Sequence, residues 1–194
     1  LPLPQVPSAA EDGDWAMALC STHSGIRMRI RSHLMHALRH AEEEVLLATA
    51  YFVPDRGLLR ELERAAKRGV EVRLLVPGES DVQSVQAAGE HSYHRLLDAG
   101  VHIHTWLDSH MHAKAAVVDK RWGLVGSYNL DFASLLHNLE LVVEVVGDDA
   151  PQELTRVLRS DLAASPELSL EQWQKRPFSD KLLSTLAYQF RRIL

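Results

Sequence analysis

The sequence has a single cysteine, Cys20, so it holds no internal disulfide and suits a reducing compartment. It has no apolar run as long as a membrane-spanning helix requires, and no signal peptide with a charged start and a long apolar centre. Its formal charge of −5 excludes a strong basic field over the whole surface, of the kind that recruits nucleic acid. What remains is a globular protein of 194 residues, of which an ordinary 46% are hydrophobic.

The start of the chain differs in composition from the rest. The segment Leu1–Pro7 contains Pro2, Pro4 and Pro7, and proline favours a stiff, extended chain. We therefore predict a linker over residues 1–14. Because position 1 is not methionine, we expect this sequence to be a piece of a longer protein.

Strand-like and helix-like segments alternate over residues 15–106. Apolar segments at 15–21, 45–50, 70–76 and 101–106 predict strands, and helical spacing at 27–41, 57–68 and 84–98 predicts helices. Within the first helix we expect His33, His36 and His40 to be mostly solvated. The alternation indicates an α/β fold with a mixed, largely parallel sheet flanked by helices on both faces.

The remaining segments predict three strands and then helices. Strands at 113–118 and 122–125 are joined by a tight turn from Asp119 to Gly123, and a fully buried strand follows at 139–146. A helix is expected from Pro151 to about Ala164, then a short helical turn at 170–173. A final helix carries an apolar stripe flanked by basic residues; the stripe consists of Leu182, Leu183, Leu186, Phe190 and Ile193, and the flanks of Lys181, Arg191 and Arg192. This helix either docks on its own domain or lies on anionic lipid.

One stretch, from His110 to Glu140, carries a chemical signature. His112, Lys114 and Asp119 form the pattern H-x-K-x-x-x-x-D, which chance gives about 0.02 times in a chain of this composition. The rest of the signature follows as Gly126-Ser127-Tyr128-Asn129 and Asn138-Leu139-Glu140. Chance is a poor explanation for the whole combination.

The residue types in this stretch suit a reaction at phosphorus. His112 can act as a nucleophile or proton carrier near neutral pH. Lys114, two residues later, leaves the same face of a strand and supplies a fixed positive charge for a phosphate oxygen. Ser127 and Asn129 follow Gly126 two residues apart, so on an extended chain their side chains leave the same face and add neutral hydrogen-bond donors.

The two acids of the signature have different expected roles. Asp119 is seven residues from His112 and points to the other face of a strand, so we expect it to close the turn rather than touch substrate. Glu140 begins a core strand, where an acid without a polar partner is costly. We predict that its carboxylate lies within hydrogen-bond reach of a ring nitrogen of His112 and holds one tautomer. The alternative is that Glu140 pairs with a surface Arg or Lys at the sheet edge.

On these residues the stretch resembles the signature of the phospholipase D superfamily, whose members cut or exchange phosphodiester bonds. Other segments look like the second half of bacterial cardiolipin synthases, namely Ala50–Asp55, residues 58–77 with Asp81, residues 93–101 and the tail from Trp173. The resemblance implies a site in which two copies of the signature meet. One histidine becomes a phosphohistidine and the other moves protons, with no cofactor and no metal.

The resemblance also assigns roles to residues of this chain. His112 is one of the two histidines, Lys114 and Asn129 bind phosphate oxygens, and Ser127 lies beside them. Glu140 orients His112, and Asp119 is a motif residue with a structural role. The chain holds only one signature, so a complete site needs either a missing amino-terminal half or a second copy of the chain; the proline-rich start favours the missing half.

The resemblance implies a division into a linker (1–14), a phospholipase D-like catalytic half-domain (15–165) and a C-terminal helical tail (166–194). It implies phosphatidyl transfer between phospholipids, or phospholipid hydrolysis. The expected location is the bacterial cytoplasmic membrane, with peripheral contact, or the cytoplasm.

Three alternatives stay open. The first is a homodimeric, single-signature nuclease of the same superfamily, with His91, His94 and Arg95 as the nearby basic candidates. The second is a domain without activity that keeps the fold for binding or dimerisation. The third is a zinc site on a densely spaced set of histidines, which consists of His102, His104, His110 and His112.

Overall fold

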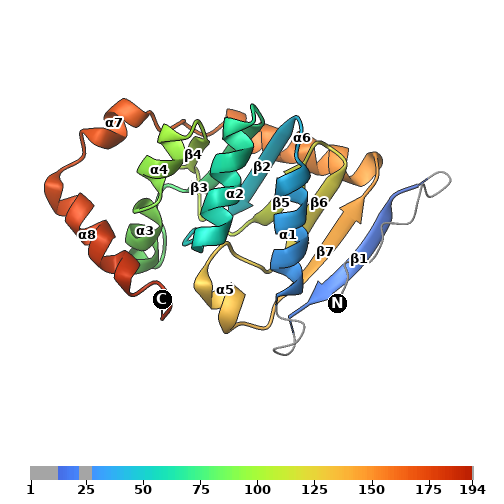
Figure 1. Cartoon of the computed structure of the whole chain (residues 1–194), viewed down its shortest axis with the longest axis horizontal. Coiled ribbons are helices and arrows are strands. Elements are labelled where there is room, and N and C mark those ends of the chain that lie inside the picture. The colour runs from blue at the N-terminus through green and yellow to red at the C-terminus, as the bar shows by residue number, and fades with distance from the viewer. Residues whose placement is uncertain (1–12, 22–27, 194) are drawn as a thin grey trace.

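The computed structural model describes residues 13–21 and 28–193, and it contains one sheet with helices on both faces (Figure 1). Nearly all of the expected linker lies outside these described residues. The strands are β1 (Trp15–Cys20), β2 (Glu44–Thr49), β3 (Glu71–Pro77), β4 (His102–Trp106), β5 (Lys114–Val118), β6 (Trp122–Gly126) and β7 (Leu141–Val146). The helices are α1 (Arg29–His40), α2 (Arg56–Lys67), α3 (Gln83–Glu90), α4 (Tyr93–Asp98), α5 (Phe132–Leu136), α6 (Asp149–Ala163), α7 (Leu170–Gln174) and α8 (Phe178–Gln189).

The sheet has the strand order β1-β7-β6-β5-β2-β3-β4. The α/β class and the mixed sheet are confirmed, but the expectation of a largely parallel sheet is wrong. Among the described strands, only the pairs β2–β3 and β3–β4 are parallel, and the other four pairs are antiparallel. The reason is that β5 pairs with β2 in the opposite direction, and β6, β7 and β1 then follow in alternating directions across the sheet.

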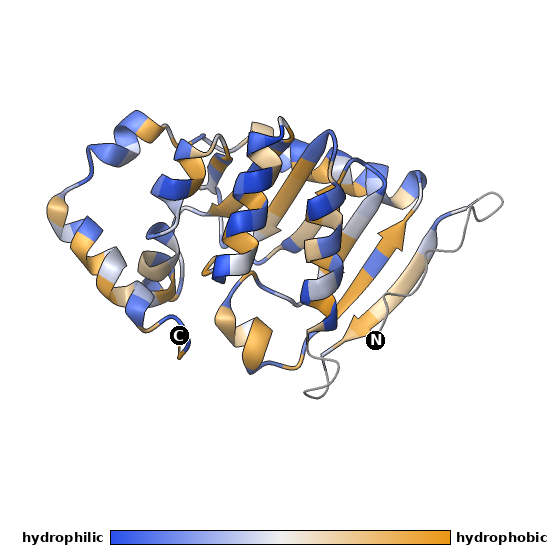
Figure 2. Cartoon of the chain, in the orientation of Figure 1, coloured by the Kyte–Doolittle hydropathy of each residue, from blue (hydrophilic) through white to orange (hydrophobic). Residues whose placement is uncertain are grey.

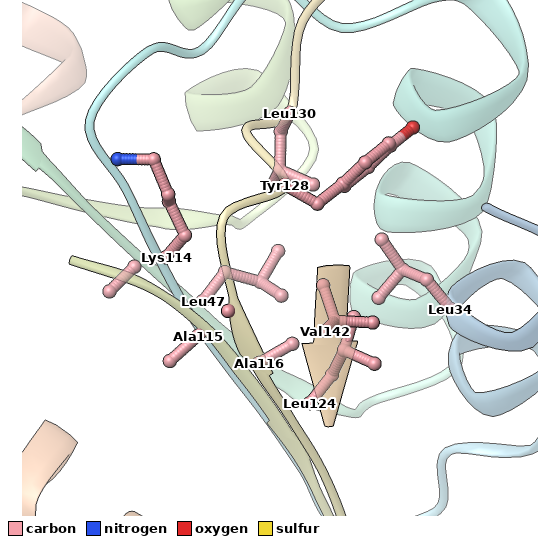
Figure 3. A pocket seen from close by; sticks show the side chains of 11 residues that line it. Leu34, Leu47, Lys114, Ala115, Ala116, Leu124, Tyr128, Leu130 and Val142 are labelled. Carbon is pink, nitrogen blue, oxygen red and sulfur yellow. The ribbon is translucent and has the colours of Figure 1, made fainter. Parts of the chain in front are cut away.

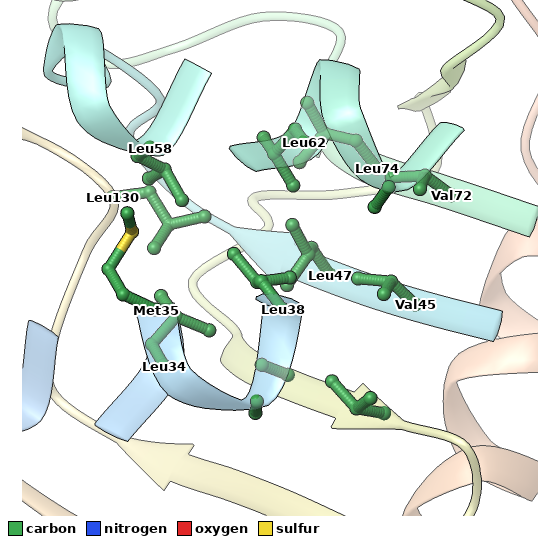
Figure 4. Packing of buried hydrophobic residues seen from close by; sticks show 14 of the residues in the cluster. Leu34, Met35, Leu38, Val45, Leu47, Leu58, Leu62, Val72, Leu74 and Leu130 are labelled. Atoms are coloured by element: carbon green, nitrogen blue, oxygen red, sulfur yellow. The ribbon is translucent and has the colours of Figure 1, made fainter. Parts of the chain in front are cut away.

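Two helical layers hold the parallel part of the sheet. Figure 4 shows Leu34 and Leu38 of α1 with Leu62 of α2 beside Leu47 and Leu74 of the strands, and all five side chains are buried. On the opposite face, α6 packs its buried leucines, Leu158 and Leu162, against β2 and β5. Burying such a side chain contributes about 1.5–3 kcal/mol, so the strands are held from both sides.

Asp55 connects the first two helices. Its carboxylate caps α2 by accepting hydrogen bonds from the N–H groups of Gly57 and Leu58, at 2.6 and 3.3 Å. It also accepts two hydrogen bonds from the guanidinium of Arg31 on α1. Burial alone would raise the pKa of Asp55, but these donors outweigh it and lower the pKa.

Two expectations about elements need correction. The helix expected at 84–98 is two helices, α3 and α4, which are separated at His91-Ser92. The strand β7 is not fully buried, because α6 leaves part of the sheet open on its side. Val142 and Glu144 point inward, while Leu141 and Val143 are 53% and 39% exposed.

The expectation that His33 is solvated is also wrong. His36 and His40 are exposed, but His33 is buried on the inner side of α1. Its Nδ1 lies 2.8 Å from a carboxylate oxygen of Glu144 on β7, and the indole N–H of Trp122 donates to the same carboxylate. A polar cluster therefore fastens α1 to β6 and β7.

The last two helices lie beyond the β4 edge of the sheet (Figure 1). In α7, Trp173 packs on Tyr93 with ring centroids 5.2 Å apart. The helix α8 packs on α3 through Ser184 and Tyr188. Within the described residues, no helix has the length and apolar character needed to cross a membrane.

We predict that Glu144→Ala lowers the free energy of unfolding by about 3 kcal/mol, because it leaves His33 and Trp122 without their buried partner. Urea denaturation measures the change. The control is Glu153→Ala, which removes an exposed pair with Arg156 on α6 and should cause no measurable change. An equal effect of the two variants would show that the buried cluster does not stabilise the fold.

Candidate functional site

The candidate site lies where the ends of three antiparallel strands meet. Because β5, β6 and β7 alternate in direction, the start of β5, the end of β6 and the start of β7 lie at the same end of the sheet. Gly126 allows the close approach of β6 and β7, since a Cβ there would collide with the carbonyl oxygen of Leu141. The residues that follow Gly126 are thereby held beside those that precede β7.

The residues of the signature line an open depression of about 600 Å³ at this end of the sheet. It is lined by His112, Lys114, Gly126, Ser127, Asn129, Asn138, Leu139 and Glu140. The structure thus brings together every predicted site residue except Asp119.

Lys114 is fixed in the wall of the depression. It is the first residue of β5 and is buried, and Figure 3 shows its nitrogen directed away from the apolar side chains of Leu34, Leu124 and Val142. Its ammonium donates a hydrogen bond to the carbonyl oxygen of His112 at 2.9 Å. His112 itself is exposed and precedes the strand rather than lying on it, so the lysine fixes the main chain that carries the histidine.

Burial lowers the pKa of Lys114 below its usual value. The negative charges of Glu140 and Asp131 oppose this effect by favouring the protonated form. Burial in turn raises the pKa of the Asp131 carboxyl, which caps α5 by accepting a hydrogen bond from the N–H of Ser134 at 2.7 Å. Lys114 is therefore a partly desolvated cation, and the nearby acids Glu140 and Asp131 favour its charged state.

Glu140 has a different partner from the one expected. Its carboxylate accepts a hydrogen bond from the hydroxyl of Ser127, and among the described residues it forms none with His112. The reason lies in the strand order: β6 separates β5 from β7, and the N–H of Ser127 bonds the carbonyl oxygen of Leu141 at 2.9 Å. Ser127 is therefore the nearest polar neighbour, although His112 and Glu140 line the same depression.

The side chain of Asn129 lines the depression, and its amide oxygen already accepts a hydrogen bond. Its Oδ1 accepts a hydrogen bond from the N–H of Tyr51 at 3.4 Å, and its own N–H donates to the hydroxyl of Ser134 at 3.1 Å. With Oδ1 held by Tyr51, the Nδ2 group is the part of this side chain suited to donate to a ligand.

Sequence reasoning missed Ser21, which supports the site from behind. This fully buried serine accepts a hydrogen bond from the N–H of Glu140 at 2.8 Å and donates to the carbonyl oxygen of Asn138 at 3.2 Å. Its own N–H donates to the carbonyl oxygen of Glu140 at 2.8 Å. No local pattern around Ser21 predicts its contact with Glu140, which is 119 residues away in the sequence.

A second hollow, of about 200 Å³, adjoins the depression at His112. Tyr51, Asp81, His110 and Met111 are among its lining residues. The Tyr51 hydroxyl donates to Asp81 at 2.8 Å, and this hydrogen bond is the main cause that lowers the pKa of the Asp81 carboxyl. Both residues lie in segments that the resemblance covers, but nothing in the sequence predicted that they would meet.

Two of the four histidines of the zinc alternative have other partners. His102 Nδ1 lies 2.7 Å from a carboxylate oxygen of Glu167, and His104 Nδ1 lies 3.1 Å from the carbonyl oxygen of Ser165. Across the described part of the chain, no three His, Cys, Asp or Glu residues are placed to hold a metal ion.

Asp119 lies at the far end of β5, in the turn to β6, where it adopts a positive φ of 52°. Its carboxylate accepts hydrogen bonds of 2.8–2.9 Å from three successive N–H groups, those of Glu42, Glu43 and Glu44. These contacts fasten the turn to the start of β2 and agree with the structural role expected from the sequence.

Comparison with known proteins places these observations in a family context. Residues 34–162 match the family model described as "Cardiolipin synthase, PLD-like domain". The sequence is 35% identical over 189 residues to cardiolipin synthase A of Serratia proteamaculans (strain 568), which covers 97% of this chain and 39% of that protein. The chain therefore spans about two-fifths of the length of this relative.

Two solved structures share the fold. Nuc from Salmonella typhimurium, a phospholipase D family member, has a TM-score of 0.68 at 16% identity and covers 81% of this chain and 99% of its own. Phosphatidylserine synthase of Haemophilus influenzae Rd KW20 has a TM-score of 0.69 at 15% identity and covers 93% of this chain and 46% of its own. At these identities the likeness shows the fold alone.

We predict that Asp119→Ala lowers the free energy of unfolding by about 2 kcal/mol, because the N–H groups of Glu42, Glu43 and Glu44 at the start of β2 lose their acceptor. Asp119→Asn should cost less, since asparagine tolerates a positive φ and keeps one acceptor oxygen. Chemical denaturation of both variants measures the difference. Equal losses for alanine and asparagine would refute the role assigned to the acceptor oxygens.

Proposed function

Because this chain belongs to the phospholipase D-like family of cardiolipin synthases, we propose that it supplies half of a site that exchanges phosphodiester bonds in phospholipids. The observation that carries this proposal is the gathering of His112, Lys114, Ser127, Asn129 and Glu140 around one open depression. The proposed reaction is phosphatidyl transfer between phospholipids, and it becomes hydrolysis when water replaces the second alcohol.

His112 is one of the two histidines that the reaction needs. As nucleophile, its ring nitrogen forms a bond to phosphorus while the bond from phosphorus to the first alcohol oxygen breaks. That alcohol takes a proton from the second histidine as it leaves. The second alcohol then gives a proton to the second histidine, attacks phosphorus and breaks the phosphorus–nitrogen bond.

Lys114 and Asn129 are the proposed donors to the phosphate oxygens. These oxygens gain negative charge as phosphorus becomes five-coordinate, and donors fixed in advance stabilise that charge most effectively. The contacts of Lys114 with His112 and of Asn129 with Tyr51 support this, because they restrict both side chains before substrate arrives. Glu140 accepts a hydrogen bond from Ser127, and its negative charge favours the protonated form of Lys114.

A second half with its own signature completes the site in this proposal. Leu139, at the rim of the depression, is 73% exposed, and Leu141, Val143 and Val125 continue an exposed apolar surface over the open part of the sheet. Contiguous apolar surface of this kind marks an interaction site. Since the chain spans only 39% of the length of its relative, we propose that the remaining polypeptide of a longer protein packs there.

The nuclease alternative has less support. Its structural likeness to Nuc extends to the fold alone, and the charge of −5 disfavours binding to a polyanion. Assays of the complete protein on phospholipid and on DNA separate the two reactions.

We predict that His112→Ala abolishes turnover of phospholipid and leaves the fold intact, because His112 is the only histidine among the described residues that line the depression, and the proposed reaction needs a ring nitrogen there. The assay uses the complete enzyme, or the dimer if that proves active. His94→Ala, which removes an exposed histidine of α4, is the matched control and should keep full activity. Activity near wild type in His112→Ala would remove this histidine from the mechanism.

We predict that Lys114→Ala and Asn129→Ala each lower the catalytic rate constant about 10²–10³-fold and change lipid affinity much less, because their donors act mainly on charge that develops in the transition state. Steady-state kinetics of the complete enzyme separates the two effects. Lys67→Ala, at an exposed position of α2, controls for the loss of one positive charge. A fall in affinity with an unchanged rate constant would make both residues ground-state contacts only.

A further inference from the structure

The helix α8 turns its apolar side chains away from the protein. The exposed fractions of the six side chains that form this stripe lie between 47% and 81%. They are Phe178, Leu182, Leu183, Leu186, Phe190 and Ile193. We call this surface the α8 stripe; hydrophobic residues recur along the helix in Figure 2. An exposed apolar surface of this extent on one element marks an interaction site.

The opposite side of α8 makes the contact with the domain. Ser184 and Tyr188, four residues apart and so on one side of the helix, are its buried residues. The Tyr188 ring stacks on His91 with centroids 4.4 Å apart, and Tyr188 packs with Val85 and Ala88 of α3. Docking on its own domain therefore leaves the stripe uncovered by the described residues.

The charges around the stripe are predominantly basic. Residues 175–193 carry five lysines and arginines and one acid, Asp180, whereas the whole chain has a charge of −5. Lys175 pairs with Glu171 and Arg176 with Glu90, so the basic border of the stripe consists of Lys181, Arg191 and Arg192. Lys181 and Arg192 are exposed, and Arg191 lies over the Tyr188 ring at 4.3 Å. An apolar face bordered by basic side chains complements an anionic lipid surface, where the helix lies in the plane of the headgroups.

The far end of the stripe comes close to the depression. The guanidinium of Arg191 lies 5.8 Å from the centroid of the Phe132 ring on α5, and His137 Nε2 lies 3.3 Å from the carbonyl oxygen of Arg192. The chain then runs directly from His137 to Asn138, Leu139 and Glu140 in the wall of the depression. A membrane that binds the end of the α8 stripe would therefore lie next to the depression, where the phosphate of a substrate would enter.

We propose that the α8 stripe docks on the surface of a membrane that contains anionic phospholipid. The choice of a lipid occupant rests on the proposed function. A second half is the less suitable occupant, because the apolar surface that borders the depression lies on β6 and β7, near the β1 edge, while α8 lies beyond the β4 edge (Figure 1). The two apolar surfaces thus serve different partners.

Sedimentation with vesicles tests the docking. The full chain should sediment with vesicles that contain phosphatidylglycerol and much less with vesicles of phosphatidylcholine alone. Leu183→Ser, Leu186→Ser and Phe190→Ser combined should lower the partition coefficient at least about tenfold, because three apolar side chains no longer enter the interface. Lys181→Gln with Arg192→Gln should lower it about fivefold per charge and reduce its salt dependence.

The matched control changes three exposed apolar residues elsewhere, by Val125→Ser, Leu141→Ser and Val143→Ser, and should bind vesicles as the unaltered chain does. Thermal unfolding monitors the fold of every variant. Equal binding by the stripe variant and the control would overturn the docking, as would failure of the unaltered chain to bind anionic vesicles. If the stripe variant bound vesicles unchanged but lost self-association or pairing with the second half, the lipid docking would be overturned in favour of a protein occupant.

An activity measurement separates this proposal from the proposed function. In the complete enzyme, the stripe variant should keep its activity on short-chain phosphatidylglycerol below the critical micelle concentration and lose activity on vesicles. Binding through the stripe without turnover of any phospholipid would contradict the proposed function and support the docking. Equal activity of variant and parent on vesicles would contradict the docking and support the function.

Discussion

The antiparallel register of β5, β6 and β7 determines where every residue of the candidate site lies. The turn after β5 sets this register, with Asp119 and Lys120 both at positive φ. It aligns the end of β6 with the starts of β5 and β7, so that segments distant in sequence reach one depression. Gly126 then permits the close backbone approach that places Ser127 against Glu140. A shift of one residue in this register would turn Lys114 to the other face of the sheet.

The residues of the site could be predicted because their chemistry and spacing are local properties of the sequence. Their partners could not, because these depend on the order of strands. Glu140 was expected beside His112, but β6 lies between their strands and provides Ser127 instead. Ser21 escaped notice for the same reason, since its contact with Glu140 is made by the pairing of β1 with β7.

The fold shows the same division between local and distant information. Helices and strands follow from apolar periodicity, and α1 begins and ends within two residues of its predicted bounds. The mixed direction of the sheet depends on how β5 pairs with β2, which no local pattern specifies. The polar and basic residues near His33 in α1 predict an exposed position, but His33 is buried because Glu144, distant in sequence, is its buried partner. For α8, periodicity identified the apolar side of the helix but not which side faces the domain.

The two edges of the sheet differ in their protection. At β4, the segment after α6 covers the edge, through hydrogen bonds from the N–H of Thr105 to Pro166 and from the N–H of Leu168 to Ile103. At the other edge, within the residues that the structure describes, β1 has no strand beyond it and carries the small exposed side chains of Ala16 and Ala18. An exposed edge strand without charged side chains leaves main-chain N–H and C=O groups with which another strand can pair. The isolated chain is therefore exposed to sheet extension between copies at β1, and its solubility depends on what lies against that edge.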